Sequence, residues 1–228
     1  MIIGSWTPLR SEGAKQSEEM LVSFDRSRPA RVLILPALFD EANKMRRFTL
    51  TVMRALDEAG IDSFLPDFPG CNDSLVPSSE QSLETWREYA HTACEQLTAT
   101  HFLSIRGGAL VAPAHLPGWR YASVDGAKLL RGMIRAQAIA AREAGRNSTT
   151  QELLEEGRAN GLMLGGWQLS AAIVSGLENE ALSTNPAHSE ITQGDIGGAG
   201  LWLRAEPGED AEQAIALATV IAESITPS

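Results

Sequence analysis

Residues 31–35 read RVLIL, a short apolar run rich in branched side chains that Pro36 closes. A run without polar alternation is typical of a strand that is buried on both faces of a parallel sheet. Two further strand candidates follow at residues 61–65 (IDSFL) and 101–105 (HFLSI). The sequence therefore predicts three central strands in a sheet of this kind.

Helices are predicted between these strands. Residues 45–59 place apolar side chains at near-helical spacing, and Gly60 follows as a C-terminal cap. A second helix is predicted to end near Leu97, with Ser78 and Gln81 at the spacing of a capping box. Strands that alternate with helices through short loops favour right-handed crossovers and a mostly parallel sheet covered on both faces, which is an α/β fold.

The flanking segments extend this sheet. Residues 19–24 predict an antiparallel strand, joined to the strand at 31–35 as an edge hairpin by a Ser-Arg-Pro turn, so we expect a mixed sheet. Residues 119–124 and 201–203 predict later strands, and an alanine-rich helix is expected to end near Glu223. Without repeats or linkers, residues 1–228 are interpreted as one domain.

Residues 126–176 interrupt the alternation. They predict two helices, the second capped by Thr149 with Glu152, then a hairpin at Gly165-Gly166 and a short helix from Ser170. Such an insert occupies the place where sheets of this kind bind ligands, over the carboxyl ends of the strands. Two interpretations stay open, a lid or a helical layer without a gating role.

Composition limits the classes of function. The chain has 228 residues, 43% of them hydrophobic, which is ample for a buried core. Its 29 acidic and 19 basic residues give a net charge of -10, which argues against nucleic-acid binding. No apolar run approaches a membrane span, and no signal sequence is recognisable. Cys71 and Cys94 fit neither a disulfide framework nor a CxxC pair, so we expect reduced thiols and a cytoplasmic protein.

Three loops should converge at the carboxyl ends of the strands, at residues 36–47, 66–74 and 106–108. At the third loop, an α/β-hydrolase carries Gly-x-Ser-x-Gly on a strained turn that exposes the nucleophile. The corresponding residues 104–108 are Ser-Ile-Arg-Gly-Gly, so Arg106 occupies the nucleophile position. A guanidinium stays protonated and has no lone pair for attack, so it cannot act as the nucleophile.

The first loop carries the most specific pattern. Residues 36–47, PALFDEANKMRR, resemble the loop with a proline, an acidic residue and N-K-x-R-R in the exosortase A system-associated hydrolases, type 2 group. Residues 66–74 (PDFPGCNDS) look like the strand-to-loop segment of the same fold, and residues 119–131 (WRYASVDGAKLLR) resemble that group's strand and helix start. The resemblance implies an α/β-hydrolase fold, a bacterial cytoplasmic protein, and a link to exopolysaccharide and protein-sorting systems.

Arg106 is the first candidate for binding a ligand. Together with the free amides of Gly107 and Gly108 at a helix start, its guanidinium would form a compact anion site. The alternative is an internal ion pair with a carboxylate of the neighbouring loops. The acidic residues considered for that pair are Asp67, Asp73, Glu41 and Asp125.

Loop 36–47 supplies the other ligand-binding candidates: Leu38, Asn43, Lys44 and Arg46. This loop has the position of the oxyanion loop in the fold. A purely structural interpretation is also open, in which Asn43 caps the following helix and Glu41 pairs with Arg46 or Arg47.

A hydrolase with a nonstandard nucleophile needs other residues. The candidates are Cys71 and Ser74, with His188 as the base, because only this histidine lies late enough in the chain for a triad. A buried thiol, a turn-capping hydroxyl and a histidine in a loop before the last strand are the structural alternatives. No spacing typical of a metal site appears, and no cofactor is predicted.

The sequence thus favours a catalytically degenerate α/β-hydrolase homologue that binds a small anionic or acyl ligand in an accessory role. An active esterase or thioesterase-like enzyme is the alternative. A structural role as a homo-oligomer is a third class, which the sequence leaves open.

Overall fold

A computed structural model describes residues 1–8, 17–146 and 148–225, and its centre is a seven-stranded sheet of order β1-β2-β4-β3-β5-β6-β9. Strands β4, β3, β5, β6 and β9 run parallel to one another, whereas β1 pairs antiparallel with β2 and β2 pairs antiparallel with β4. The mixed sheet with a parallel centre is therefore confirmed. The strands are β1 (Ile2–Trp6), β2 (Glu19–Phe24), β3 (Arg31–Leu35), β4 (Asp62–Pro66), β5 (His101–Ile105), β6 (Gly118–Tyr121) and β9 (His188–Ile191).

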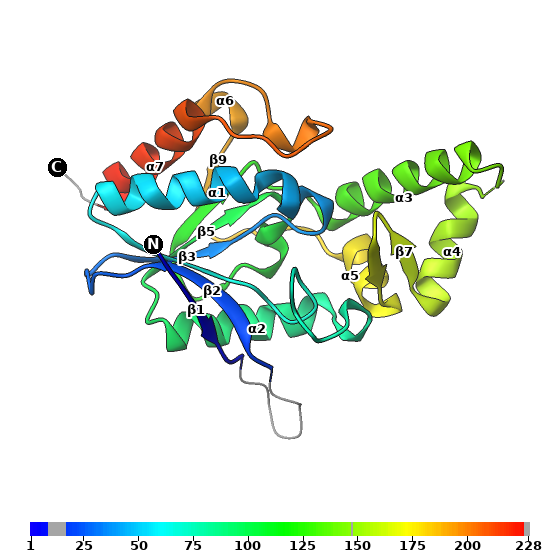
Figure 1. The fold of residues 1–228 in the computed structure, drawn as a ribbon, viewed down its shortest axis with the longest axis horizontal. Coiled ribbons are helices and arrows are strands. Elements are labelled where there is room, and N and C mark those ends of the chain that lie inside the picture. The colour runs from blue at the N-terminus through cyan, green and yellow to red at the C-terminus, as the bar shows by residue number, and fades with distance from the viewer. Residues whose placement is uncertain (9–16, 147, 226–228) are drawn as a thin grey trace.

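Helices cover both faces of the sheet (Figure 1). Helices α1 (Asp40–Glu58) and α7 (Ala211–Ile225) pack on one face, and α2 (Leu83–Gln96) packs on the other. Strand β3 explains this arrangement, because its alternate side chains point to opposite faces. Val32 and Ile34 belong to the core under α1 and α7, whereas Leu33 belongs to the core under α2, and all three are fully buried.

The predicted insert lies in the chain between the neighbouring strands β6 and β9. It contains α3 (Gly126–Glu143), α4 (Thr150–Asn160), the hairpin of β7 (Leu162–Leu164) with β8 (Trp167–Leu169), and α5 (Ala171–Asn179). The capping box of Thr149 with Glu152 and the Gly165-Gly166 turn are confirmed. These elements form the end of the molecule opposite the carboxyl terminus of α7 (Figure 1). No helix of the described part has both the length and the hydropathy needed to cross a bilayer.

The predicted edge hairpin of β2 with β3 is wrong. Strand β2 pairs with β1 and β4, and β3 lies beyond β4. Asp62 explains this placement, because its buried carboxylate accepts the backbone N–H groups of Arg26 and Arg28 at 2.8–3.1 Å. These bonds hold the turn after β2 against the start of β4.

The predicted cap of α2 is wrong, and so is the alternative interpretation of Asn43 as a helix cap. The capping box of α2 consists of Ser82 and Thr85, because Ser78–Glu80 forms a separate 3₁₀ turn before an extended Gln81. Helix α1 begins at Asp40 with Phe39 in the cap position, so Asn43 lies inside the helix and caps nothing.

The end of the sheet differs from the prediction as well. Residues Leu201–Leu203 form a 3₁₀ turn and no strand. Leu201 is buried and Trp202 packs against the core, while Leu203 is 77% exposed, and the segment pairs with no described strand. His188, which was expected in a loop before the last strand, instead begins the last strand, β9.

Candidate functional site

The turn after β5 retains the backbone geometry of a nucleophile turn. Arg106 has a φ of 53°, a strained value for a residue with a side chain. The turn also lies directly against the loop after β3. A Cβ atom on Gly108 would come 2.4 Å from the carbonyl oxygen of Leu35 and 2.5 Å from that of Pro36. Only glycine fits this position, because the backbone of the turn after β5 lies directly against the backbone of Leu35 and Pro36.

The Arg106 side chain is fully engaged inside the protein. Its Nε and Nη2 donate to the two carboxylate oxygens of Glu41 at 3.0 Å each, and Nη1 donates to the carbonyl oxygen of Ala122 at 2.8 Å. The guanidinium lies 4.2 Å from the ring centroid of Trp202. Of the two interpretations of Arg106, the structure contains the internal ion pair. Glu41 therefore pairs with Arg106, and not with Arg46 or Arg47.

The two glycines beside Arg106 are closed off from solvent. Gly107 and Gly108 are buried in the 3₁₀ turn Arg106–Val111. The side chains of Leu38 and Leu129 lie over Gly107, where an added Cβ would come within 3.3 Å and 3.0 Å of them. Leu38 itself is 6% exposed. These candidates meet in space, but they form a packed apolar contact.

No histidine of the sequence reaches this turn. His101 and His188 begin the parallel strands β5 and β9, so they lie at the amino ends, whereas Arg106 follows the carboxyl end of β5. His91 and His115 contact each other, with ring centroids 4.8 Å apart. The prediction of His188 as a triad base is therefore wrong.

His188 is held by hydrogen bonds to neighbouring residues. Its Nδ1 accepts a hydrogen bond from Nη2 of Arg120 at 2.6 Å, and its Nε2 lies 3.2 Å from the carbonyl oxygen of Leu116. Burial and the charge of Arg120 lower the pKa of His188. The neutral imidazole is therefore the favoured form, bound within the amino end of the sheet.

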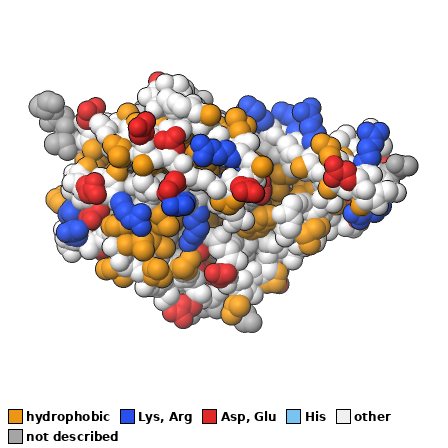
Figure 2. All heavy atoms as spheres, turned by 45° about the horizontal axis from the view of Figure 1, so that its top comes forward, with side chains coloured by type: hydrophobic (Ala, Val, Ile, Leu, Met, Phe, Trp, Pro, Cys, Tyr) orange, Lys and Arg blue, Asp and Glu red, His pale blue; other side chains and the backbone are white. Residues whose placement is uncertain are grey.

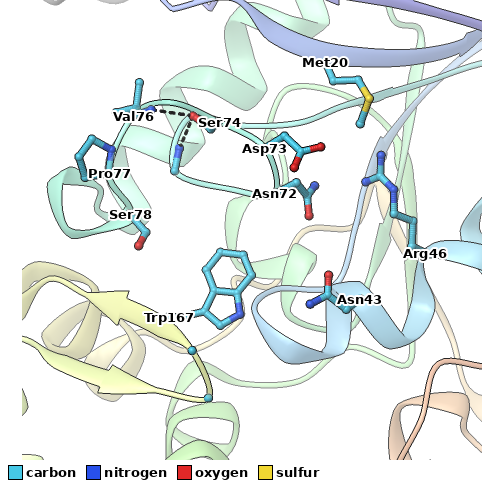
Figure 3. Close-up of a pocket in the computed structure, with 13 residues that line it drawn as sticks. Met20, Asn43, Arg46, Asn72, Asp73, Ser74, Val76, Pro77, Ser78 and Trp167 are labelled. Atoms are coloured by element: carbon cyan, nitrogen blue, oxygen red, sulfur yellow. Dashed lines mark hydrogen bonds between the residues drawn. The ribbon is translucent and has the colours of Figure 1, made fainter.

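An open cleft of about 750 Å³ lies between α1, the loop after β4 and the β7–β8 hairpin (Figure 3). Asn43 and Arg46 face it from α1, Asn72 and Asp73 face it from the loop, and Trp167 reaches into it from the hairpin. The remaining lining residues are Met20, Gly70, Ser74, Val76, Pro77, Ser78, Gly165 and Gly166. The insert thus supplies one wall of the cleft.

Arg46 is the member of the predicted basic cluster that lines this cleft. Its Nη1 donates to Oδ1 of Asp67 at 3.1 Å. Asp67 is 3% exposed, and its Oδ2 has no hydrogen-bond partner among the described residues. Lys44 instead pairs with Asp40 at 2.7 Å, one turn earlier on α1, and does not line the cleft.

A small apolar cavity of about 30 Å³ adjoins the cleft. The two spaces share Asn72 and Trp167 as lining residues. Leu38, Phe39 and Cys71 belong to the wall of the cavity. Trp167 packs edge-on against Phe39, with centroids 5.7 Å apart. A ligand with a polar group in the cleft can therefore place a small apolar end against the indole of Trp167.

Neither alternative nucleophile is activated. Burial raises the pKa of the Cys71 thiol, and the nearby charges of Asp67 and Glu19 raise it further. The Ser74 hydroxyl donates to Oε1 of Glu19 at 2.9 Å and accepts the backbone N–H groups of Gly70 and Val76 at 3.0 and 3.2 Å. A hydroxyl oxygen has two lone pairs, and both are occupied here. Ser74 therefore holds the turn, as its structural interpretation expected.

The sequence identified Asn43 and Arg46 of this cleft as candidates, but it did not identify Asn72 or Trp167. Asn72 and Trp167 lie 95 positions apart in the printed sequence and meet only because the hairpin folds back on the loop after β4. The Gly165-Gly166 turn before Trp167 was the available signal, since it predicted the hairpin. Within the described residues no group of histidine, cysteine and acidic side chains is arranged to hold a metal ion.

The strand order and the strained turn after β5 define an α/β-hydrolase fold. The chain is similar to a putative hydrolase from Agrobacterium vitis S4, with a TM-score of 0.55, 11% identity, and coverage of 99% of this chain and 100% of that one. It is also similar to mouse alpha/beta hydrolase domain-containing protein 10, with a TM-score of 0.58, 11% identity, and coverage of 97% and 98%.

A third similar structure is the esterase domain of a Rhodothermus marinus protein, with a TM-score of 0.51, 12% identity and 98% coverage of both chains. At these identities the similarity shows the fold alone. No family model matches the chain, and no curated protein is significantly similar to it.

Proposed function

We propose that this protein is a catalytically degenerate α/β-hydrolase homologue that binds a small anionic or acyl ligand without hydrolysing it. The observation that carries the proposal is Arg106. It occupies the strained turn where hydrolysis requires a nucleophile, and its guanidinium is bound to Glu41 and Ala122. The backbone of the turn has the strained conformation, while the Arg106 side chain packs inside the protein and neutralises the Glu41 carboxylate.

The cleft supplies groups suited to such a ligand. Arg46 uses one nitrogen for Asp67, which leaves further N–H donors of the guanidinium for a carboxylate or phosphate group. The amides of Asn43 and Asn72 are neutral partners that donate or accept. A short acyl end would pack on Trp167, toward the apolar cavity that Leu38 helps to line.

The pathway is inferred from the resemblance of residues 36–47 to the exosortase A system-associated hydrolases. The proposed role is that of a bacterial cytoplasmic accessory protein in exopolysaccharide production and protein sorting. Within this role the insert acts as a lid, because the β7–β8 hairpin forms one wall of the cleft and carries Trp167. Residues 1–228 act as one unit in this proposal.

Isothermal titration calorimetry with butyrate, which joins a carboxylate to a short acyl chain, tests the binding site. We expect the wild-type protein to bind butyrate, Arg46→Ala and Trp167→Ala to lose binding, and Arg47→Ala to bind like the wild type. Arg47 is the matched control, since it lies one position further on α1 and pairs with Glu209 outside the cleft. Equal affinity in Arg46→Ala, or no binding of acetate, butyrate or hexanoate by the wild type, contradicts the proposal.

The second candidate is an enzyme, because Ser74 lines the cleft and its hydroxyl donates to the buried carboxylate of Glu19, although backbone N–H groups occupy both of its lone pairs. This candidate is an esterase or thioesterase that uses Ser74 or Cys71. Turnover of p-nitrophenyl butyrate that is abolished by Ser74→Ala or Cys71→Ala would establish it and reject the noncatalytic role. We expect no turnover above that of buffer in any of the three proteins.

A further inference from the structure

The solvent face of helix α3 is basic, although the chain as a whole has a charge of -10. Lys128, Arg131, Arg135 and Arg142 lie at spacings of three, four and seven residues, which places them on one side of the helix. The buried residues Leu129, Leu130, Ile134 and Ala141 occupy the opposite side. Glu143 is the single acidic residue of the helix. Figure 2 shows Lys and Arg side chains at the end of the molecule that the insert forms.

These cations have no acidic partner within the described residues. Arg131, Arg135, Arg142 and Arg146 are exposed, and none takes part in an ion pair there. The other arginine of this surface, Arg158 on α4, is paired with Glu178.

The arginines border a groove between α3 and α4. One hollow of about 450 Å³ is lined by Arg131, Arg135 and Arg158 beside the apolar Ile134 and Leu154. A second hollow, of about 430 Å³, has Arg142 and Arg146 beside Ala138 and the 61% exposed Ile139. Both hollows include Thr150, so they follow one another along α3. We call this surface the α3–α4 groove.

We propose that the α3–α4 groove binds an acidic segment of a partner protein, in which carboxylates alternate with apolar side chains. Every cation of the groove lining is an arginine. The planar guanidinium binds a carboxylate through two parallel hydrogen bonds, which the lysine ammonium cannot do. The apolar residues between the arginines give the partner's apolar side chains a surface to cover.

Other anionic partners fit this surface less well. The exposed Glu152, Glu155 and Glu156 of α4 lie on the helix that forms the other side of the groove, and they would repel a flat anionic bilayer. Neither α3 nor α4 contains an aromatic residue on which a nucleic-acid base could stack. A peptide can lie inside the groove, where five arginines and a single glutamate, Glu155, line the two hollows.

Fluorescence anisotropy tests this inference with a short fluorescein-labelled peptide in which pairs of glutamates alternate with leucines. We expect the wild-type protein to bind it, and Arg131→Ala with Arg135→Ala to weaken binding about tenfold, as expected for the loss of two exposed ion pairs. Glu155→Gln should tighten binding, because Glu155 is the acidic residue of the groove lining. Circular dichroism confirms that each variant is folded.

Arg54→Ala is the matched control, since Arg54 is an exposed arginine on α1, outside the groove. It should bind the peptide like the wild type.

The inference is overturned if the wild type does not bind the peptide, if the double variant binds it equally well, or if a peptide with glutamines in place of the glutamates binds as tightly. Preferential binding of anionic vesicles or of a single-stranded oligonucleotide through these arginines would also overturn it. Because the groove does not share residues with the Trp167 cleft, either proposal can fail alone.

Discussion

Arg106 and Glu41 lie 65 residues apart in the chain and form a bidentate ion pair, with both N–O distances at 3.0 Å. The pair joins the turn after β5 to the first turn of α1. Both side chains are mostly buried, with 11% and 16% of their surface exposed. The turn that presents a nucleophile in an α/β-hydrolase is therefore bound here to the start of α1.

Replacement of Arg106 by alanine should cost about 3 kcal/mol of unfolding free energy, because it leaves the largely buried Glu41 carboxylate without its partner. Urea unfolding at neutral pH measures this loss. Arg106→Ala combined with Glu41→Ala should be more stable than the sum of the single changes predicts, because the second change removes the unpaired charge. Single changes that add without coupling would show that the pair contributes nothing to stability.

Restoration of a serine should not restore hydrolysis. Arg106→Ser places a hydroxyl on the strained turn, but no imidazole lies at the carboxyl ends of the strands to accept its proton. Hydrolysis of p-nitrophenyl butyrate by this variant should equal that of the wild type and of Arg106→Ala. A rate that increases only in Arg106→Ser would contradict this, since it would reveal a base that the structure does not place there.

Local patterns were sufficient to predict the centre of the fold. The last four residues of the strands at 31–35 and 101–105 are buried, so their apolar composition predicts these strands directly. Strand β1 lacks this mark, because four of its five residues are exposed. The partner of β2 was mistaken because the turn after β2 is bound by the carboxylate of Asp62, which lies 36 and 34 positions further along the chain than Arg26 and Arg28.

The site was predictable in its parts but not in its geometry. The sequence identified Arg106 at the nucleophile position and Arg46 in the loop after β3, and both lie at the carboxyl end of the sheet. It could not choose Glu41 among four carboxylates, because that choice depends on where α1 begins. Trp167 required the fold of the insert, which brings the hairpin to the loop after β4.

Gly108 should tolerate no side chain. Gly108→Ala would place a Cβ atom 2.4–2.5 Å from two backbone carbonyl oxygens, and we expect a loss of about 2 kcal/mol or more. Gly132→Ala is the control, because Gly132 is exposed on α3 with open space around its Cβ position. That change should stabilise the protein by about 0.5–1 kcal/mol through helix propensity. Thermal unfolding measures the melting temperature of both variants. A Gly108→Ala variant that melts at the wild-type temperature would contradict the close approach of the two backbones.

The two thiols should resist alkylation in the folded protein. Burial raises the pKa of Cys94 to about 12, and burial together with the charges of Asp67 and Glu19 raises that of Cys71. At pH 8 both thiols are therefore protonated, and the thiolate is the reactive form. Mass spectrometry after iodoacetamide treatment should find both cysteines unmodified until urea unfolds the chain. Rapid modification of Cys71 in native protein would instead support its candidacy as a nucleophile.

Asp25 should make stability dependent on pH in the acid range. Its pKa is lowered to about 2, first by the hydrogen bond from the Arg31 side chain and then by the backbone N–H of Ser27. A folded-state pKa below the unfolded value of about 3.9 stabilises the protein at higher pH, and this contribution is lost as the pH falls from about 4 to about 2. Because the side chain is 37% exposed, solvent screening limits the contribution to about 1 kcal/mol. Asp25→Asn should therefore lower the unfolding free energy at pH 6. The difference between this variant and the wild type should disappear near pH 2. About 1 M salt should reduce the difference at pH 6, because salt screens exposed charges. A difference that stays constant between pH 6 and pH 2 would show that the ionised carboxylate of Asp25 does not stabilise the fold.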